Sequence, residues 1–441
     1  MNASVFEVVS LALVFGLMVV LIRRKVDVSL ALVAGAVALG VLFGIDWARL
    51  PRGVARALLG VGANLARVAV KPTFWELLGL VLLIQFLGHA LRHVASLERL
   101  IAVLKTLLSD RRAAMAVAPA FVGLLPMPGG ALFSAPMVGE LTNDLDVPSE
   151  DRALINYWFR HIWEWTWPLY PGILFAAAIA QASLGKLILA QSPMTLAAIA
   201  IGVGFCFRRV RLPAHEGPKA PAGTWLEFLA AVWPVALVIV LTAALAALGR
   251  VTERLGVRGQ TALLIALALV VPAFLASKRV PWRQVAHLVR ATVTVQMVLL
   301  VFGVVAFGEM LGAYGAAEAL PRIFADWGVP PLVLMFCVPY LVGLLTGYMP
   351  AVVGICFPLL VPLIVEATPA GRAIHYGRLV FAYAGGLLGV LSSPVHLCLV
   401  LSREYFKADF GLVYRRLALW LLLLALAGLG VMALWEAAGL R

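Results

Sequence analysis

The sequence predicts an all-α polytopic membrane protein with two inverted repeats of five transmembrane helices, each with a re-entrant helical hairpin and a broken helix. Three observations predict this fold. The 441 residues are 63% hydrophobic and only 13% charged, whereas soluble domains are about 45–50% apolar and about 25% charged. Ten apolar runs approach the length of about 20 residues that a bilayer-spanning helix needs. Two further apolar blocks are interrupted by proline and glycine.

The first five predicted crossings are each bounded by charged or turn-forming residues. They lie at about residues 5–22, 28–45, 74–91, 157–180 and 187–207. No basic segment precedes the first run, and Arg23, Arg24 and Lys25 follow it. This order of charges indicates a transmembrane helix rather than a cleaved signal peptide.

The second five predicted crossings follow a polar, proline-rich stretch. They lie at about residues 225–248, 261–276, 292–311, 376–401 and 413–435. Because proline and polar residues are typical of connections, we interpret residues 208–224 as a cytoplasmic linker. The chain is then divided into a first repeat, residues 1–207, and a second repeat, residues 225–441.

Each repeat contains an apolar block that cannot cross the membrane as one helix. The blocks lie at about residues 113–141 and 330–365, and proline and glycine divide each into two short arms. Short apolar arms indicate a re-entrant segment. A break at membrane depth is tolerated only where protein or water satisfies the backbone. We therefore predict a helical hairpin in each repeat.

The two halves also resemble each other in sequence. The run that begins at Pro119 and ends at Leu125 aligns with the run from Pro339 to Leu345, directly before each break. Such internal similarity is the signature of a repeat. Because five crossings is an odd number, the second repeat would enter the membrane from the opposite face, as in the inverted repeats of secondary transporters.

The distribution of basic residues predicts the orientation. The larger share of the 35 Lys and Arg residues falls on one side of the predicted topology, and that side is expected to be cytoplasmic. The protein would then lie in the inner (plasma) membrane of the cell, with both termini on the extracytoplasmic side. The net charge of +13 is explained by these loops, so no nucleic-acid partner is expected. The mixed apolar and basic segments at residues 49–71 and 92–112 suit helices along the interface.

The two hairpin tips are the first candidate substrate site. Glycines let the backbone turn sharply and expose amide groups at the start of the returning arm, and such helix N-termini attract anions. A purely structural turn is the alternative for the first tip, and helix capping is the alternative for Thr346. The candidate substrate-binding residues of the tips are Pro128, Gly129, Gly130, Ala131, Ser134, Thr346, Gly347, Tyr348 and Pro350.

The helix after each hairpin is also interrupted by proline, which removes a helical hydrogen bond. The freed carbonyls, together with Thr166, Ser392 and Ser393, could bind a coupling cation or a polar solute. The alternative is a kink satisfied by these hydroxyls.

Ionisable residues within the membrane are expensive, so they are functional candidates. We predict a coupling role for His396, which can titrate near neutral pH, and for Glu164 and His161. Glu164 and His161 share a helix face with Arg160 and could instead form a neutralised ion cluster.

Several catalytic signatures are absent from the sequence. It contains no GxxxxGK[ST] or HExxH motif,. Its four cysteines stand singly in apolar runs and are expected to pack as small hydrophobic residues. We therefore expect no metal, no cofactor other than Na+ or H+ as a coupling ion, and no enzymatic activity.

The two broken hairpins and the broken helices resemble the ion transporter superfamily, which includes gluconate, citrate and dicarboxylate permeases. The run from Leu125 to Leu132 and the run from Ser392 to Leu397 are most similar to an uncharacterised integral membrane family, domain-of-unknown-function family four-hundred-one. The resemblance implies a homodimer, with a scaffold formed by the early helices of each half and a mobile unit formed by the hairpins and broken helices. Neither tip carries the Asn of the sodium-coupled members.

The predicted function is an elevator-type secondary active transporter. It would move a small polar or anionic solute across the lipid bilayer, coupled to protons or sodium. A channel of the same fold is one alternative. A membrane-embedded lipid flippase or enzyme is the other, although the sequence shows no paired carboxylates or nucleophile and base at membrane depth.

Overall fold

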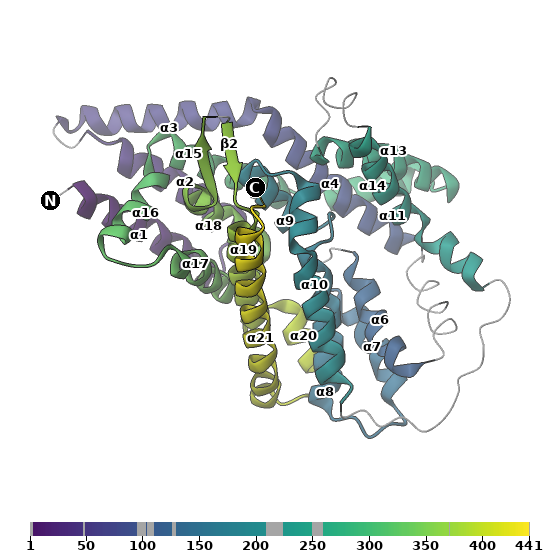
Figure 1. Cartoon of the computed structure of the whole chain (residues 1–441). Coiled ribbons are helices and arrows are strands. Elements are labelled where there is room, and N and C mark those ends of the chain that lie inside the picture. Colours follow the sequence, from purple (N-terminus) through teal and green to yellow (C-terminus); the bar gives the residue numbers. More distant parts are fainter. Residues whose placement is uncertain are drawn as a thin grey trace.

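The computed structural model describes residues 3–46, 49–94, 103, 110–125, 129–208, 224–248, 259–369 and 371–440. Figure 1 shows an almost entirely helical molecule. The first half comprises α1 (Ala3–Arg23), α2 (Val28–Gly44), α3 (Arg52–Val70), α4 (Pro72–His93), α6 (Arg111–Gly123), α7 (Ala131–Thr142), α8 (Ser149–His161), η2 (Ile162–Trp165), α9 (Pro171–Ala180) and α10 (Leu184–Cys206).

The second half follows the same order of elements. It comprises α11 (Thr224–Ala247), α13 (Gly259–Ser277), α14 (Trp282–Thr292), α15 (Val295–Ala313), α16 (Ala316–Asp326), α17 (Pro331–Thr346), α18 (Met349–Ile364), β1 (Val365–Thr368), β2 (Gly371–Ile374), α19 (Tyr376–Ser392), α20 (Leu397–Phe406) and α21 (Phe410–Ala437). The antiparallel pair β1–β2 is a small addition that the sequence did not predict.

Each predicted crossing coincides with a helix or a pair of helices. Among the described residues, eight helices are long and apolar enough to cross a membrane, or nine if the bent α11 is one span. One of the eight is α3, which the sequence assigns to the interface, and Figure 1 shows it running crosswise to α10 and α21 along one edge of the molecule. The all-α fold of a polytopic membrane protein is confirmed; the inversion of the repeats and the domain boundaries stay predictions.

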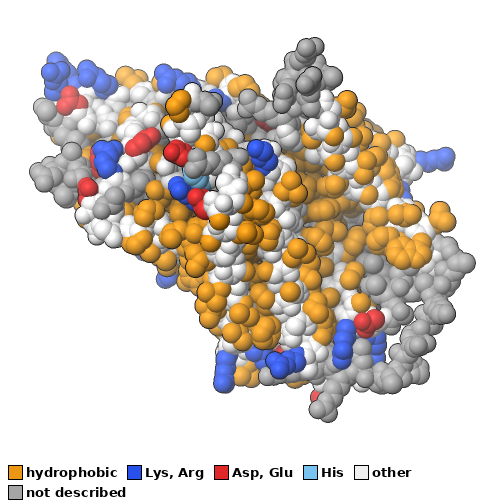
Figure 2. All heavy atoms as spheres, viewed as in Figure 1, with side chains coloured by type: hydrophobic (Ala, Val, Ile, Leu, Met, Phe, Trp, Pro, Cys, Tyr) orange, Lys and Arg blue, Asp and Glu red, His pale blue; other side chains and the backbone are white. Residues whose placement is uncertain are grey.

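The surface has the distribution expected in a bilayer. Figure 2 shows hydrophobic side chains in a broad band, with Lys and Arg concentrated towards its two ends. Helix α21 is apolar on both faces: Leu417 and Leu424 are buried, whereas Leu422 and Leu426 are each 56% exposed. A helix that is hydrophobic all round lies within a membrane or a large core, so the exposed leucines mark a lipid-facing surface.

The halves pack against each other like with like. Among the early helices, α2 packs against α15 of the other half, and α4 packs against α13, α14 and α15. Among the late helices, α8 packs against α20 and α21, and α9 packs against α18. The early helices therefore pack together across the two halves, as do the late ones, and the two sets meet where α18 packs against α15 and α2 and where α9 packs against α4.

Both predicted hairpins are pairs of packed helices, α6 with α7 and α17 with α18. At the base of the first, Arg111 Nη1 donates to Asp144 Oδ2 at 2.8 Å and Nη2 donates to the Leu141 carbonyl at 2.7 Å. The guanidinium lowers the pKa of the exposed Asp144 carboxyl to about 2. This ion pair therefore holds the two arms together at neutral pH and is lost as the pH falls towards 2.

Some predictions lie outside the described residues. They are the interior of the linker at residues 209–223, most of the interfacial segment 92–112, and the tip residues 126–128, which include Pro128.

The closest helix packing in the second half is between α17 and α19. Cβ atoms added at Gly385 and Gly389 would overlap the backbones of Phe336 and Tyr340, and one added at Gly343 would overlap the Gly386 carbonyl. Small residues at such contacts let helix backbones approach within a membrane. The second hairpin is thus fixed to the broken helix behind it.

Gly389→Ala should destabilise the protein, because the new methyl group would meet the Tyr340 backbone, which no rotamer change can relieve. Overpacking of this kind typically costs about 1–3 kcal/mol. The midpoint of thermal unfolding in detergent measures the effect. Gly430→Ala in α21 is the matched control, since a Cβ there meets nothing within 4 Å. A midpoint for Gly389→Ala at or above the wild-type value would contradict the packing.

Candidate solute-binding site

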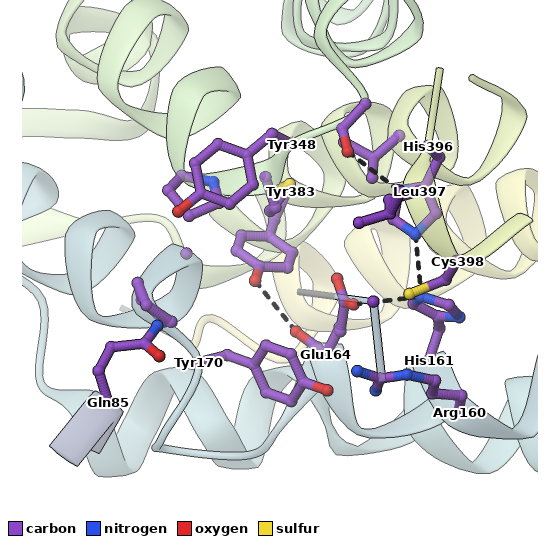
Figure 3. Close-up of a pocket in the computed structure, with 17 residues that line it drawn as sticks. Gln85, Arg160, His161, Glu164, Tyr170, Tyr348, Tyr383, His396, Leu397 and Cys398 are labelled. Carbon is purple, nitrogen blue, oxygen red and sulfur yellow. Dashed lines mark hydrogen bonds and ion pairs between the residues drawn. The ribbon is translucent and has the colours of Figure 1, made fainter. Parts of the chain in front are cut away.

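The two hairpin tips and the two helix breaks line one cavity of about 150 Å³. Figure 3 shows its lining, with residues from the α8–α9 region facing those that precede and begin α20. Helix α4 of the early group contributes Gln85. A cavity needs about 10–15 Å³ to hold one water molecule, so this cavity has room for a solute the size of several water molecules.

Four helices begin at this cavity, and each contributes residues of its N-terminal end to the lining. They are α7 with Gly129, α9 with Pro171 and Gly172, α18 with Met349 and Pro350, and α20 with Leu397 and Cys398. None of the four N-cap residues has a side chain that caps its own helix. A helix N-terminus carries about half a positive elementary charge. Together they place roughly two positive charges around the cavity.

Arg160, at the end of α8, adds a formal positive charge and is only 3% exposed. Its guanidinium packs against Gly130 so closely that a Cβ at Gly130 would occupy its position. The Arg160 carbonyl packs in the same way against Gly123 at the end of α6. The two glycines therefore seat Arg160 in the bend of the first hairpin, beside the amides that open α7.

Three predicted coupling residues meet in the same cavity. His161 Nε2 lies 3.8 Å from Glu164 Oε1 and 3.0 Å from His396 Nε2. His396 is 235 positions from His161 in the chain, so the fold brings the two breaks together. Glu164 is the one carboxylate among the lining residues, and the helix N-termini together with Arg160 outweigh it. The cavity is electropositive and suits an anion.

Tyrosine hydroxyls satisfy several backbone carbonyls that the breaks release. Tyr383 donates to the Glu164 carbonyl at 3.0 Å, Tyr157 to that of Leu391 at 2.9 Å, and Tyr414 to that of Ser392 at 3.0 Å. Buried carbonyls without partners are costly. These tyrosines therefore stabilise irregular backbone at membrane depth.

The cavity collects part of the predicted substrate site. Gly129, Gly347, Tyr348 and Pro350 line it, with Gly129 and Gly347 in the left-handed region at φ +70 and +62. Gly130 lies outside the lining and packs against the Arg160 guanidinium. Ala131 is buried, and its carbonyl accepts a hydrogen bond from Asn156 Nδ2 at 3.2 Å.

The predicted hydroxyl donors bond within the protein and lie outside the cavity lining. Thr346 donates to the Val342 carbonyl at 2.8 Å, Ser392 to Leu388 at 2.7 Å, and Ser393 to Leu344 at 2.7 Å. The Thr166 hydroxyl pairs with that of Thr195 at 3.0 Å. Ser134 lies 3.5 Å from the Ala131 carbonyl. Their roles in binding stay predictions.

Sequence reasoning gave no binding role to several lining residues. Arg160 was recognisable as a charge in an apolar segment, but only as a partner for Glu164. Cys398, Gln85 and Tyr383 carry no local signal, because a single cysteine, glutamine or tyrosine in a long helix is more often a packing residue. Their place at the cavity depends on tertiary structure.

Comparison with known proteins decides the family. Residues 7–435 match the family described as a protein of unknown function, DUF401. The chain belongs to this family. The match covers nearly the whole DUF401 chain, so the hairpins, the breaks and the cavity all lie within the family region. No curated protein matches this DUF401 member.

Proposed function

We propose that the protein is an elevator-type secondary active transporter that moves a small polar solute, preferably an anion, coupled to protons or sodium. One observation carries the proposal: four helix N-termini and the buried Arg160 converge on one cavity between the two hairpin tips. Helix N-termini and guanidinium groups bind carboxylates and oxyanions through charge and directed N–H groups.

The helix packing supports transport rather than binding alone. The site lies at discontinuous helices, as solute sites do in inverted-repeat transporters. The hairpins and broken helices pack with one another across the halves, while α2 and α4 pack with the early helices of the second half. We infer that the first group moves with the solute against the second, within a homodimer in the plasma membrane.

Coupling belongs to the same proposal. His161, Glu164 and His396 line the cavity that would hold the solute. A coupling cation bound beside the anion would attract it, so each would raise the affinity of the site for the other. Such a coupling free energy between two ligands is reciprocal.

Purified protein in liposomes tests the proposal. Uptake of small carboxylates and oxyanions should follow an imposed proton or sodium gradient, should saturate, and should show counterflow when unlabelled solute is trapped inside. Saturation and counterflow distinguish a carrier from a channel of the same fold. No uptake of any tested anion under either gradient would contradict the proposal.

A further inference from the structure

Three side chains of metal-binding type meet at one side of the cavity, from segments far apart in the chain. The His161 and His396 ring nitrogens and Cys398 Sγ all lie within 4.8 Å of one another, and the three residues are buried. His161 ends α8, whereas His396 and Cys398 belong to the start of α20. Figure 3 shows all three side chains pointing towards one another.

The outer nitrogens of both imidazoles are held by backbone carbonyls. His161 Nδ1 lies 2.6 Å from the Tyr157 carbonyl oxygen, and His396 Nδ1 lies 2.9 Å from that of Gly347. A carbonyl only accepts, so each Nδ1 is the donor. In the neutral rings, each Nε2 therefore presents a lone pair, and these two atoms are 3.0 Å apart. Facing lone pairs repel each other, so a cation between the two Nε2 atoms would stabilise the two histidines in this arrangement.

The third member favours a metal ion over a shared proton. Cys398 Sγ lies within 4.8 Å of a ring nitrogen of each histidine, and all three residues are buried. Two imidazole nitrogens and a cysteine sulfur form a ligand set that zinc takes in proteins. A proton would satisfy the histidine pair without this sulfur.

We infer that His161, His396 and Cys398 bind one Zn²⁺ ion, with the fourth position facing Glu164 and the cavity. In the zinc-bound protein the two histidines are ligands of the metal, and Glu164 is the remaining coupling group. Zinc takes nitrogen at about 2.0–2.1 Å and sulfur at about 2.3 Å in tetrahedral geometry. Those bond lengths place ligand atoms roughly 3.3–3.6 Å apart, within the span of this cluster. Carbonyls that orient the outer nitrogens of metal-binding histidines are the usual second layer of support.

Metal content tests the inference independently of transport. The purified full-length protein is dialysed against Zn²⁺ and then against metal-free buffer, and zinc is measured by mass spectrometry. We expect about one zinc per chain in the wild type. His396→Gln and Cys398→Ser should weaken zinc binding by at least about tenfold. Cys206→Ser, at a buried cysteine outside this cluster, should bind zinc as the wild type does.

Cobalt gives a readout that does not depend on the stability of a variant. Co²⁺ bound to wild-type protein should show thiolate-to-metal absorption in the near ultraviolet, and Cys206→Ser should keep it. A wild type that retains no zinc and lacks this absorption would overturn the inference, as would a folded Cys398→Ser protein with unchanged zinc affinity. A failure of transport alone would leave the metal result intact.

Discussion

Arg160→Gln should weaken binding of the transported anion by at least roughly 30-fold, because removing one partner of a buried charged contact costs about 2–5 kcal/mol. Arg160 is the one Lys or Arg residue of the cavity lining, and no helix N-terminus can supply its full formal charge. Isothermal titration of the purified variant measures this loss of affinity. The titrant is the anion that most raises the midpoint of thermal unfolding of the wild type.

Two further variants show what the loss means. Arg160→Lys keeps the charge but loses the planar fork of donors, so its affinity should fall between those of the wild type and Arg160→Gln. Arg290→Gln removes an exposed charge from α14 and should bind as the wild type does. Unchanged affinity in a folded Arg160→Gln protein would remove the guanidinium from the site.

Gly130→Ala should abolish most of the anion affinity while the protein keeps its fold. The added methyl group would take the position of the Arg160 guanidinium, which can swing away because it ends a flexible side chain. The backbone at Gly130, with φ −56, accepts alanine without strain,. Affinity is measured by titration and folding by the midpoint of thermal unfolding.

Gly123→Ala provides the contrasting variant. Its methyl group would meet the Arg160 backbone carbonyl rather than the side chain, so α6 and α8 would have to separate. We expect a lower midpoint of thermal unfolding, with overpacking costs of about 1–3 kcal/mol. If Gly130→Ala lost stability and kept its affinity, the seating of Arg160 against the hairpin tip would be wrong.

The crossings and the hairpins were predictable because their signals are local. A bilayer demands a certain length of apolar chain, and the proline and glycine breaks appear directly in the sequence. Gly129 and Gly347 were recognised for the same reason, since their left-handed backbone favours glycine.

The chemistry of the cavity was less predictable because it depends on pairs distant in sequence. The sequence shows that residue 393 carries a hydroxyl. It does not show that this hydroxyl donates to the Leu344 carbonyl instead of facing the cavity. No spacing rule joins His161 to His396 and Cys398, which approach each other only through the packing of α8 against α20.

An experimental density map of the protein with a bound heavy anion would show whether the solute lies between the two hairpin tips. The anion, a selenium- or bromine-containing form of the tightest-binding solute, should appear between Gly129 and Gly347, beside Arg160, with both hairpins turning back at their tips. Density for the anion elsewhere, or either hairpin crossing the membrane as one continuous helix, would contradict a solute site between the tips.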